Sequence, residues 1–241
     1  MHIKRFRFTK AKNFRDMGGY MAENNKTVRW GVLYRSDKFT GTTPEEWKII
    51  WDSGIRTVLD LRSEEETEAS PDDCPEEIRY IHFPIVKENL SFFNISSPDM
   101  QAFAKSVSDG YKNIVLTHGE NLAKAVNITA DCLKEGGVVF HCTSGKDRTG
   151  ILAAVIYYLL GVEDEDIVAD YQVSHTYNKK TSDKFMREHP EFLRYIGVVG
   201  SDPENMYELL ELFRELDIEA YLMEKGMCPE KIQALKDIML A

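Results

Sequence analysis

One segment constrains the fold more than any other, because a strand, a loop and a helix follow one another without interruption. Residues 138–140 are apolar and partly β-branched, the loop at residues 141–150 reads HCTSGKDRTG, and residues 151–160 form the longest apolar run of the chain. A strand that turns this tightly into a helix is typical of an α/β domain, with the loop at the carboxyl edge of a central sheet. Since the helix has little polar face, we expect it at the centre of the molecule.

The remainder of the chain repeats the alternation of helices and strands. Thr43 and Pro44 predict a helix start, and Gly54 predicts its end. We expect strands at residues 55–59 and 78–83, helical structure over residues 98–135 with a break near 108–110, and helices at residues 164–174 and in three stretches after Pro203. These elements predict an α/β fold with a central, mostly parallel sheet flanked by helices, and a helical C-terminal part.

The two ends of this pattern carry weaker signals. Residues 3–8 alternate like a strand and are rich in Lys and Arg, which favours a charged edge strand, and residues 23–26 are typical of a hairpin turn. Residues 177–206 pass from polar to apolar, and we expect helices there that form either a lid over a site or plain packing. With no linker-like segment visible, we predict a single domain over residues 1–241.

Composition and charge exclude several kinds of protein. The net charge of −10 argues against a nucleic-acid partner, and the longest apolar run is about half of what a membrane span requires. No signal peptide is evident, so we expect a cytoplasmic protein. The four cysteines lack metal-ligand spacing and suit free thiols in a reducing compartment, so we predict no metal and no cofactor. Nothing in the sequence indicates an oligomeric state.

The loop itself is typical of a phosphate-binding cradle. Backbone N–H groups of a loop that wraps before a helix N-terminus point inward and bind anions. The same groups stabilise a thiolate, so Cys142 is the expected nucleophile, forming a cysteinyl-phosphate that water hydrolyses. Arg148 can hold two phosphoryl oxygens through its planar guanidinium. The remaining expected substrate-binding residues are Thr143, Ser144, Gly145, Lys146 and Thr149.

Three residues of the HCTSGKDRTG segment, Ser144, Thr149 and His141, have further expected roles. Thr149 or Ser144 can donate a hydroxyl to the sulfur, which makes the sulfur a better leaving group in the second step. His141, at the end of the strand, is expected to hydrogen-bond the loop and order it.

The sequence as a whole resembles the bacterial tyrosine/serine phosphatase family, within the protein tyrosine phosphatase superfamily. The residues that carry this resemblance are the HCTSGKDRTG loop together with residues 13–20, 34–36, 54–63 and 170–174. The resemblance implies a protein-tyrosine-phosphatase-like fold and hydrolysis of phosphotyrosine, and allows phosphoserine and phosphothreonine as well. It also implies that residues 13–20 pack beside the loop.

The source of the proton for the leaving group is left open by the sequence. Asp147 lies beside Arg148, where a carboxylate could protonate the leaving oxygen or could serve only as a structural partner of Arg148. Other tyrosine phosphatases carry this acid on a separate loop, and the chain has no Trp-Pro-Asp sequence. Asp60, Asp99 and Asp109 are therefore alternatives, with Asp60 and Arg62 otherwise expected to shape the site.

Alternative functions follow from the same residues. Lys146 adds a second cation to the loop, as in phosphoinositide-cleaving relatives, so a phosphoinositide substrate is the alternative to a phosphorylated protein. An ordinary exposed lysine is the plainer interpretation. A sulfur- or arsenate-transforming enzyme fits the ending of the loop less well. A non-catalytic phosphoprotein-binding module is disfavoured because both Cys142 and Arg148 are present.

Overall fold

A five-stranded sheet forms the centre of the computed structural model, which describes residues 2–90, 106–190, 193 and 196–241. The spatial order of the strands is β1-β2-β5-β3-β4. Strands β2, β5, β3 and β4 run parallel to one another, and only β1 is antiparallel to its neighbour. Their bounds are β1 (Arg15–Asp16), β2 (Leu33–Ser36), β3 (Ile55–Asp60), β4 (Arg79–His82) and β5 (Gly137–His141). The predicted mostly parallel sheet is confirmed.

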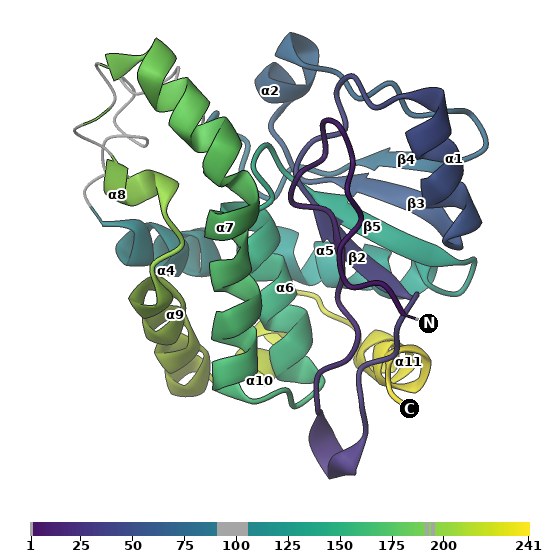
Figure 1. The fold of residues 1–241 in the computed structure, drawn as a ribbon. Coiled ribbons are helices and arrows are strands. Elements are labelled where there is room, and N and C mark those ends of the chain that lie inside the picture. Colours follow the sequence, from purple (N-terminus) through teal and green to yellow (C-terminus); the bar gives the residue numbers. More distant parts are fainter. Residues whose placement is uncertain (1, 91–105, 191–192, 194–195) are drawn as a thin grey trace.

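The central strand β5 is buried on both faces because its side chains alternate between two apolar cores. Val138 and Phe140 belong to the core that includes helices α5 (Gly119–Cys132) and α6 (Asp147–Leu159), whereas Val139 packs with Trp47 on α1 (Pro44–Asp52). Figure 1 shows α1 on one side of the sheet and α5 and α6 on the other. As predicted, α6 is central, with nearly all its residues buried.

The other helices follow in chain order, and several begin at a capping residue. A capping box starts α1 at Thr43 and another starts α2 at Ser63, where each cap hydroxyl accepts a backbone N–H and a Glu three residues later returns the contact. The remaining bounds are η1 (Glu23–Asn25), α2 (Glu64–Ala69), α4 (Val107–Thr117), α7 (Asp164–Glu188), α8 (Ile196–Val199), α9 (Pro203–Leu216), α10 (Ile218–Glu224) and α11 (Pro229–Met239). The predicted helical C-terminal part is confirmed.

Two of three local predictions need correction. Residues 3–8 form no edge strand: they contribute a single bridge between Arg5 and Arg15, because Lys4 and Arg5 turn their side chains onto aromatic rings instead of extending a ladder. The hairpin predicted at residues 23–26 is confirmed: Met21 and Thr27 form an antiparallel bridge around a short helical turn. The break expected near 108–110 falls at His118, since Ser106 caps α4 and places those residues in its first turn.

Within the described residues, no helix is both long enough and apolar enough to cross a lipid bilayer.

Candidate active site

The HCTSGKDRTG loop connects β5 to α6 at the carboxyl edge of the sheet. His141 ends the strand and Asp147 begins the helix, so residues 142–146 make the whole turn. Gly145 has φ 66°, and a Cβ atom at this position would lie 2.3 Å from the Ser36 carbonyl oxygen. Glycine is therefore required here, both for its backbone conformation and for the close approach of the loop to β2.

The loop is held by hydrogen bonds to its carbonyl oxygens. The Asn13 amide donates to the oxygens of Ser144 and Gly145 at 3.0 and 3.1 Å, and Asn178 of α7 donates to Ser144 at 2.8 Å. The guanidinium of Arg35 donates to Gly145 at 3.0 Å. Because its carbonyl groups are bound by surrounding elements, the loop keeps its backbone N–H groups for an anion on its inner side. The expected packing of residues 13–20 beside the loop is observed at Asn13.

A buried carboxylate links the elements that hold the loop. Asp170 of α7 accepts from Arg15 at 3.0 Å and from Arg35 at 2.6 Å, and all three side chains are almost fully buried. Burial works against the charged carboxylate, but the two guanidinium groups outweigh it and hold the pKa of Asp170 well below its ordinary value. The segments 13–20, 34–36 and 170–174, which are far apart in the sequence, thus form one ion-pair network behind the loop.

Cys142 and Arg148 lie at the two ends of the loop, and both are buried. Cys142 is 1% exposed and is a free thiol. Arg148 donates through both terminal nitrogens to the carboxylate of Glu66 on α2, at 2.5 and 2.8 Å. Burial alone would lower the pKa of Arg148, but Glu66 and the neighbouring Cys142 sulfur raise it above its ordinary value. The guanidinium is therefore charged, oriented and close to the thiol.

Glu66 is the main site residue that we did not predict from the sequence. Besides the two bonds from Arg148, its carboxylate accepts the Thr143 hydroxyl at 2.5 Å. Burial works against the charged form, yet these contacts lower the pKa of Glu66 to about 2. A local signal was available, since Ser63 and Glu66 have the spacing of a capping box, but that pattern does not indicate a partner 82 residues away.

Lys146 is buried, with an exposed fraction of 3%, rather than projecting into solvent. Its ammonium donates to the carbonyl oxygens of Val198 and Gly200, the latter at 3.0 Å, and lies 3.2 Å from the Asp147 carboxylate. Burial would lower the pKa of Lys146, but the Asp147 charge is the main contribution that raises it. The segment that we expected to be a lid or packing element thus contacts the loop through this side chain.

Asp147 occupies the first turn of α6 and keeps part of its surface in contact with solvent. Its side chain is 21% exposed. The Tyr111 hydroxyl of α4 donates to the carboxylate at 2.6 Å, and Tyr111 is in turn 2.8 Å from the Tyr171 hydroxyl of α7. Together with Lys146, these contacts fix the carboxylate from three elements. Thr149, two residues further along α6, is fully buried, and its hydroxyl has no hydrogen-bond partner among the described residues.

The alternative acids occupy different environments. Asp60 is fully buried and accepts from the Arg62 side chain and from the Tyr80 hydroxyl. Burial opposes its ionisation, but His141, Arg62 and Tyr80 hold the pKa of Asp60 well below its ordinary value. Asp109 is exposed in the first turn of α4, and Asp99 lies outside the described residues.

The Asp60 network also supports the start of the loop. His141 Nε2 lies 3.1 Å from Asp72 and 3.8 Å from Asp60, and these two carboxylates raise the pKa of His141 against the effect of burial. Asp60, Asp72 and His141 are close enough together to suit a metal ion. However, the Arg62 guanidinium bridges both carboxylates, at 2.6 and 2.8 Å, so this charge is already compensated and the group is an ion-pair network.

The parallel sheet and the loop between β5 and α6, with Cys142 and Arg148 buried at its two ends, are the features that we associated with the tyrosine phosphatase family from the sequence. The chain belongs to the tyrosine phosphatase family, whose sequence profile matches residues 6–241. The family predicted from the loop and its accompanying motifs is thereby confirmed.

Individual relatives are distant. A Cupriavidus necator protein named provisionally as a tyrosine-protein phosphatase is 28% identical over 177 residues, covering 71% of this chain and 63% of the relative. A tyrosine-protein phosphatase of Nostoc commune is 32% identical over 128 residues, covering 52% of this chain and 42% of the relative. The chain therefore spans less than two thirds of both proteins. The triple specificity protein phosphatase PtpB of Mycobacterium tuberculosis is 23% identical, covering 95% of this chain and 97% of the relative.

Among solved structures, Pseudomonas aeruginosa TpbA aligns with a TM-score of 0.41 and 15% identity, covering 83% of this chain and 90% of that chain. Similarity at this level carries no argument about this protein.

Proposed function

We propose that this protein hydrolyses phosphotyrosine in proteins through a cysteinyl-phosphate intermediate, with phosphoserine and phosphothreonine as further substrates. The observation that supports this most strongly is the loop between β5 and α6, which has Cys142 buried at one end and Arg148 at the other, with the guanidinium held by two hydrogen bonds to Glu66. The names of the relatives agree: two are called tyrosine-protein phosphatases, one of them provisionally, and the more distant PtpB has triple specificity.

In the first step the Cys142 thiolate attacks phosphorus, so that an S–P bond forms as the P–O bond to the tyrosine oxygen breaks. The equatorial oxygens of the phosphoryl group are bound by the Arg148 guanidinium and by the backbone N–H groups of residues 143–149, among them the backbone N–H of Lys146. Asp147 gives its proton to the leaving phenolate oxygen, which departs as tyrosine. Its partly exposed position supports this role, whereas Asp60 is fully buried and paired.

In the second step water attacks phosphorus and the S–P bond breaks, which returns the thiolate and releases inorganic phosphate. The Asp147 carboxylate takes the proton of the attacking water. A hydrogen bond from Thr149 or Ser144 to the sulfur stabilises the departing thiolate. The Thr149 hydroxyl is buried and unpaired within the described part of the chain, which supports Thr149 as this donor.

The environment of Lys146 bears on the choice between a protein and a phosphoinositide substrate. Its ammonium is engaged by two carbonyl oxygens and by Asp147, so its side chain is committed to the loop and to residues 198–200. This supports a phosphotyrosine protein over a phosphoinositide. We further propose a single domain that acts without metal, and the four free thiols support a cytoplasmic setting.

Substitution of Asp147 by Asn tests the assignment of the acid. We expect a large fall in kcat on phosphotyrosine peptides and a much smaller fall on an activated aryl phosphate, whose leaving group needs no proton. Equal losses on the two substrates would remove Asp147 from this role.

A substrate panel tests the function as a whole. Phosphotyrosine peptides should be hydrolysed faster than phosphoinositides, a chelator should have no effect, and Cys142→Ser should be inactive. Inactivity of the wild-type protein on every phosphopeptide would contradict the proposal.

A further inference from the structure

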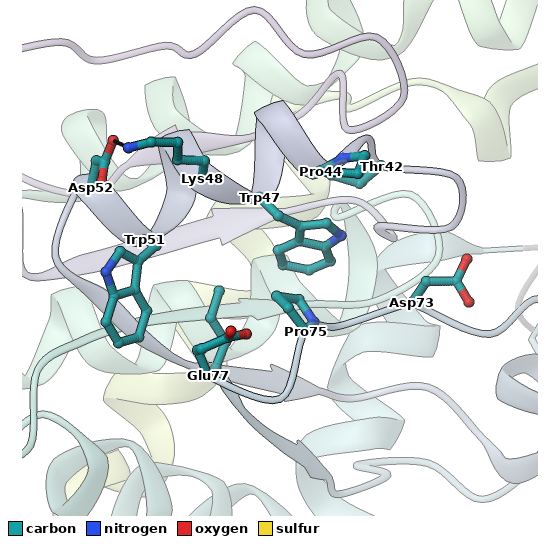
Figure 2. Close-up of a pocket in the computed structure, with 10 residues that line it drawn as sticks. Thr42, Pro44, Trp47, Lys48, Trp51, Asp52, Asp73, Pro75 and Glu77 are labelled. Atoms are coloured by element: carbon teal, nitrogen blue, oxygen red, sulfur yellow. Dashed lines mark hydrogen bonds and ion pairs between the residues drawn. The ribbon is translucent and has the colours of Figure 1, made fainter.

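A groove beside the site is lined by residues that the proposed reaction does not use. It lies between α1 and the segment that leads into β4, with a cavity volume of about 600 Å³. Trp47 and Trp51, one helical turn apart, form one wall, and Pro75 lies opposite (Figure 2); Ile78 also lines the groove. Trp51 is 36% exposed, so the groove presents a large aromatic surface.

Two buried polar atoms in the groove wall have no partner. Trp47 is only 5% exposed and Thr42 only 8% exposed. Among the described residues, neither the indole Nε1 of Trp47 nor the hydroxyl of Thr42 has a hydrogen-bond partner. A buried donor without an acceptor is costly to a folded protein, which is why such donors are found where a ligand supplies the acceptor. Figure 2 shows the Trp47 nitrogen on the side of the ring that faces Asp73. A peptide carbonyl is the acceptor that an indole N–H suits.

The charges of the groove favour a cationic ligand. Lys48 and Asp52 neutralise each other at 2.6 Å, which leaves Asp73 and Glu77. Both are exposed, and neither forms an ion pair with any residue that the structure describes. In addition, Arg56 lies over the Trp51 ring at 3.6 Å, so this indole already binds a guanidinium by a cation–π contact. Acidic groups beside tryptophans are suited to arginine side chains.

The groove is close to the active-site loop. Thr42, at one end, is four residues from Lys38, whose backbone N–H donates to the Thr143 carbonyl of the loop. Four residues span at most about 14 Å. Asp73, at the same end, follows Asp72 in the network that supports His141. A peptide whose phosphotyrosine occupies the loop therefore reaches the end of the groove at Thr42 and Asp73 with about four to six further residues, and the end at Trp51, about 13 Å further along α1, with about four more.

We propose that this groove binds an extended, arginine-bearing segment of the phosphoprotein substrate, adjacent to its phosphotyrosine. The segment runs along the wall that Trp47 and Trp51 form, its basic side chains pair with Glu77 and Asp73, and a main-chain carbonyl accepts the Trp47 N–H. This inference rests on the proposed function and adds to it a preference for basic substrates, which the net charge of −10 reinforces.

Two phosphotyrosine peptides test the proposal. They share the residues around phosphotyrosine, and one carries two arginines about six residues away where the other carries serines. On the wild-type protein the basic peptide should have a KM about tenfold lower at low salt, with unchanged kcat. Trp51→Ala and Glu77→Gln should each remove most of that advantage, while turnover of a small aryl phosphate stays at the wild-type level. Glu120→Gln, an exposed change on α5, is the matched control.

Several outcomes would overturn the inference. Equal KM values for the two peptides, or an advantage that survives Trp51→Ala, would exclude basic-segment docking. A groove variant that changes self-association in sedimentation but leaves KM unchanged would also exclude it, because the groove would then bind a second copy of the chain.

If no phosphopeptide is hydrolysed, the proposed function fails separately. Fluorescence titration of the non-phosphorylated arginine peptide, with the wild type and with Trp51→Ala, still decides whether the groove binds it: equal affinities would contradict the inference, and weaker binding by the variant would support it.

Discussion

The pair formed by Glu66 and Arg148 makes a quantitative prediction about stability. Both side chains are 5% exposed, and the pKa of Glu66 falls from 4.5 to about 2 in the folded protein. Since one pKa unit corresponds to about 1.4 kcal/mol, ionised Glu66 stabilises the fold by about 3 kcal/mol at neutral pH. A carboxylate with a lowered pKa contributes fully above its unfolded value. The contribution therefore declines as the pH falls below about 4.5, to about 1 kcal/mol at pH 3.

Glu66→Gln removes this charge and keeps the shape of the side chain. Urea unfolding of the wild type and of the variant should differ by about 3 kcal/mol at pH 7, and the difference should shrink by about 2 kcal/mol at pH 3. Because Arg148 loses a fixed partner, kcat/KM on phosphotyrosine peptide should also fall about tenfold or more. Glu65→Gln, the exposed neighbour, is the control and should change neither quantity. A stability difference that is the same at both pH values would refute this reasoning.

Three further changes address the surroundings of the loop. Tyr111→Phe removes a hydrogen bond that holds the Asp147 carboxylate in place, so kcat on a phosphotyrosine peptide should fall about tenfold; an unchanged kcat would exclude this contact from catalysis. Lys146→Met removes the cation that lies 3.2 Å from the same carboxylate, so kcat on this peptide should also fall about tenfold, and an unchanged kcat would contradict the ion-pair interpretation. Asn13→Ala removes one of the two donors to each of the Ser144 and Gly145 carbonyl oxygens, so the loop is held less firmly and the inhibition constant of inorganic phosphate should rise about tenfold. Asn127→Ala, whose amide donates to Gly226 elsewhere, should leave it unchanged.

Much of the fold was accessible from the sequence because the signals are local. The run from β5 through the loop to α6 combines an apolar strand with an apolar helix, and the start of α1 has both a capping residue and a proline. The N-terminal segment misled us for a physical reason. Alternation predicts a strand only if a partner strand is available, and here Lys4 and Arg5 stack on Tyr20 and Tyr177 instead.

The parts of the site that the sequence did not reveal depend on contacts between distant segments. The pairing of Arg148 with Glu66, the bridge from Asp170 to Arg15 and Arg35, and the enclosure of Lys146 by residues 198–200 all join residues more than 50 positions apart. The type of a charged residue does not indicate which distant residue it pairs with in the folded protein. We expected Lys146 to be a second cation in the loop, with an exposed loop lysine as the alternative, and its burial follows from the approach of residues 198–200 to the loop.

The central claim is that Cys142 carries the phosphoryl group during turnover. Rapid acid quenching of the wild-type protein with a phosphotyrosine peptide, followed by mass spectrometry of proteolytic fragments, tests it most directly. The account predicts one phosphoryl group on the fragment that contains Cys142, more of it when Asp147→Asn slows the second step on an activated substrate, and none in Cys142→Ser. Turnover with no phosphoryl group on Cys142, or with the group on another residue, would contradict the account.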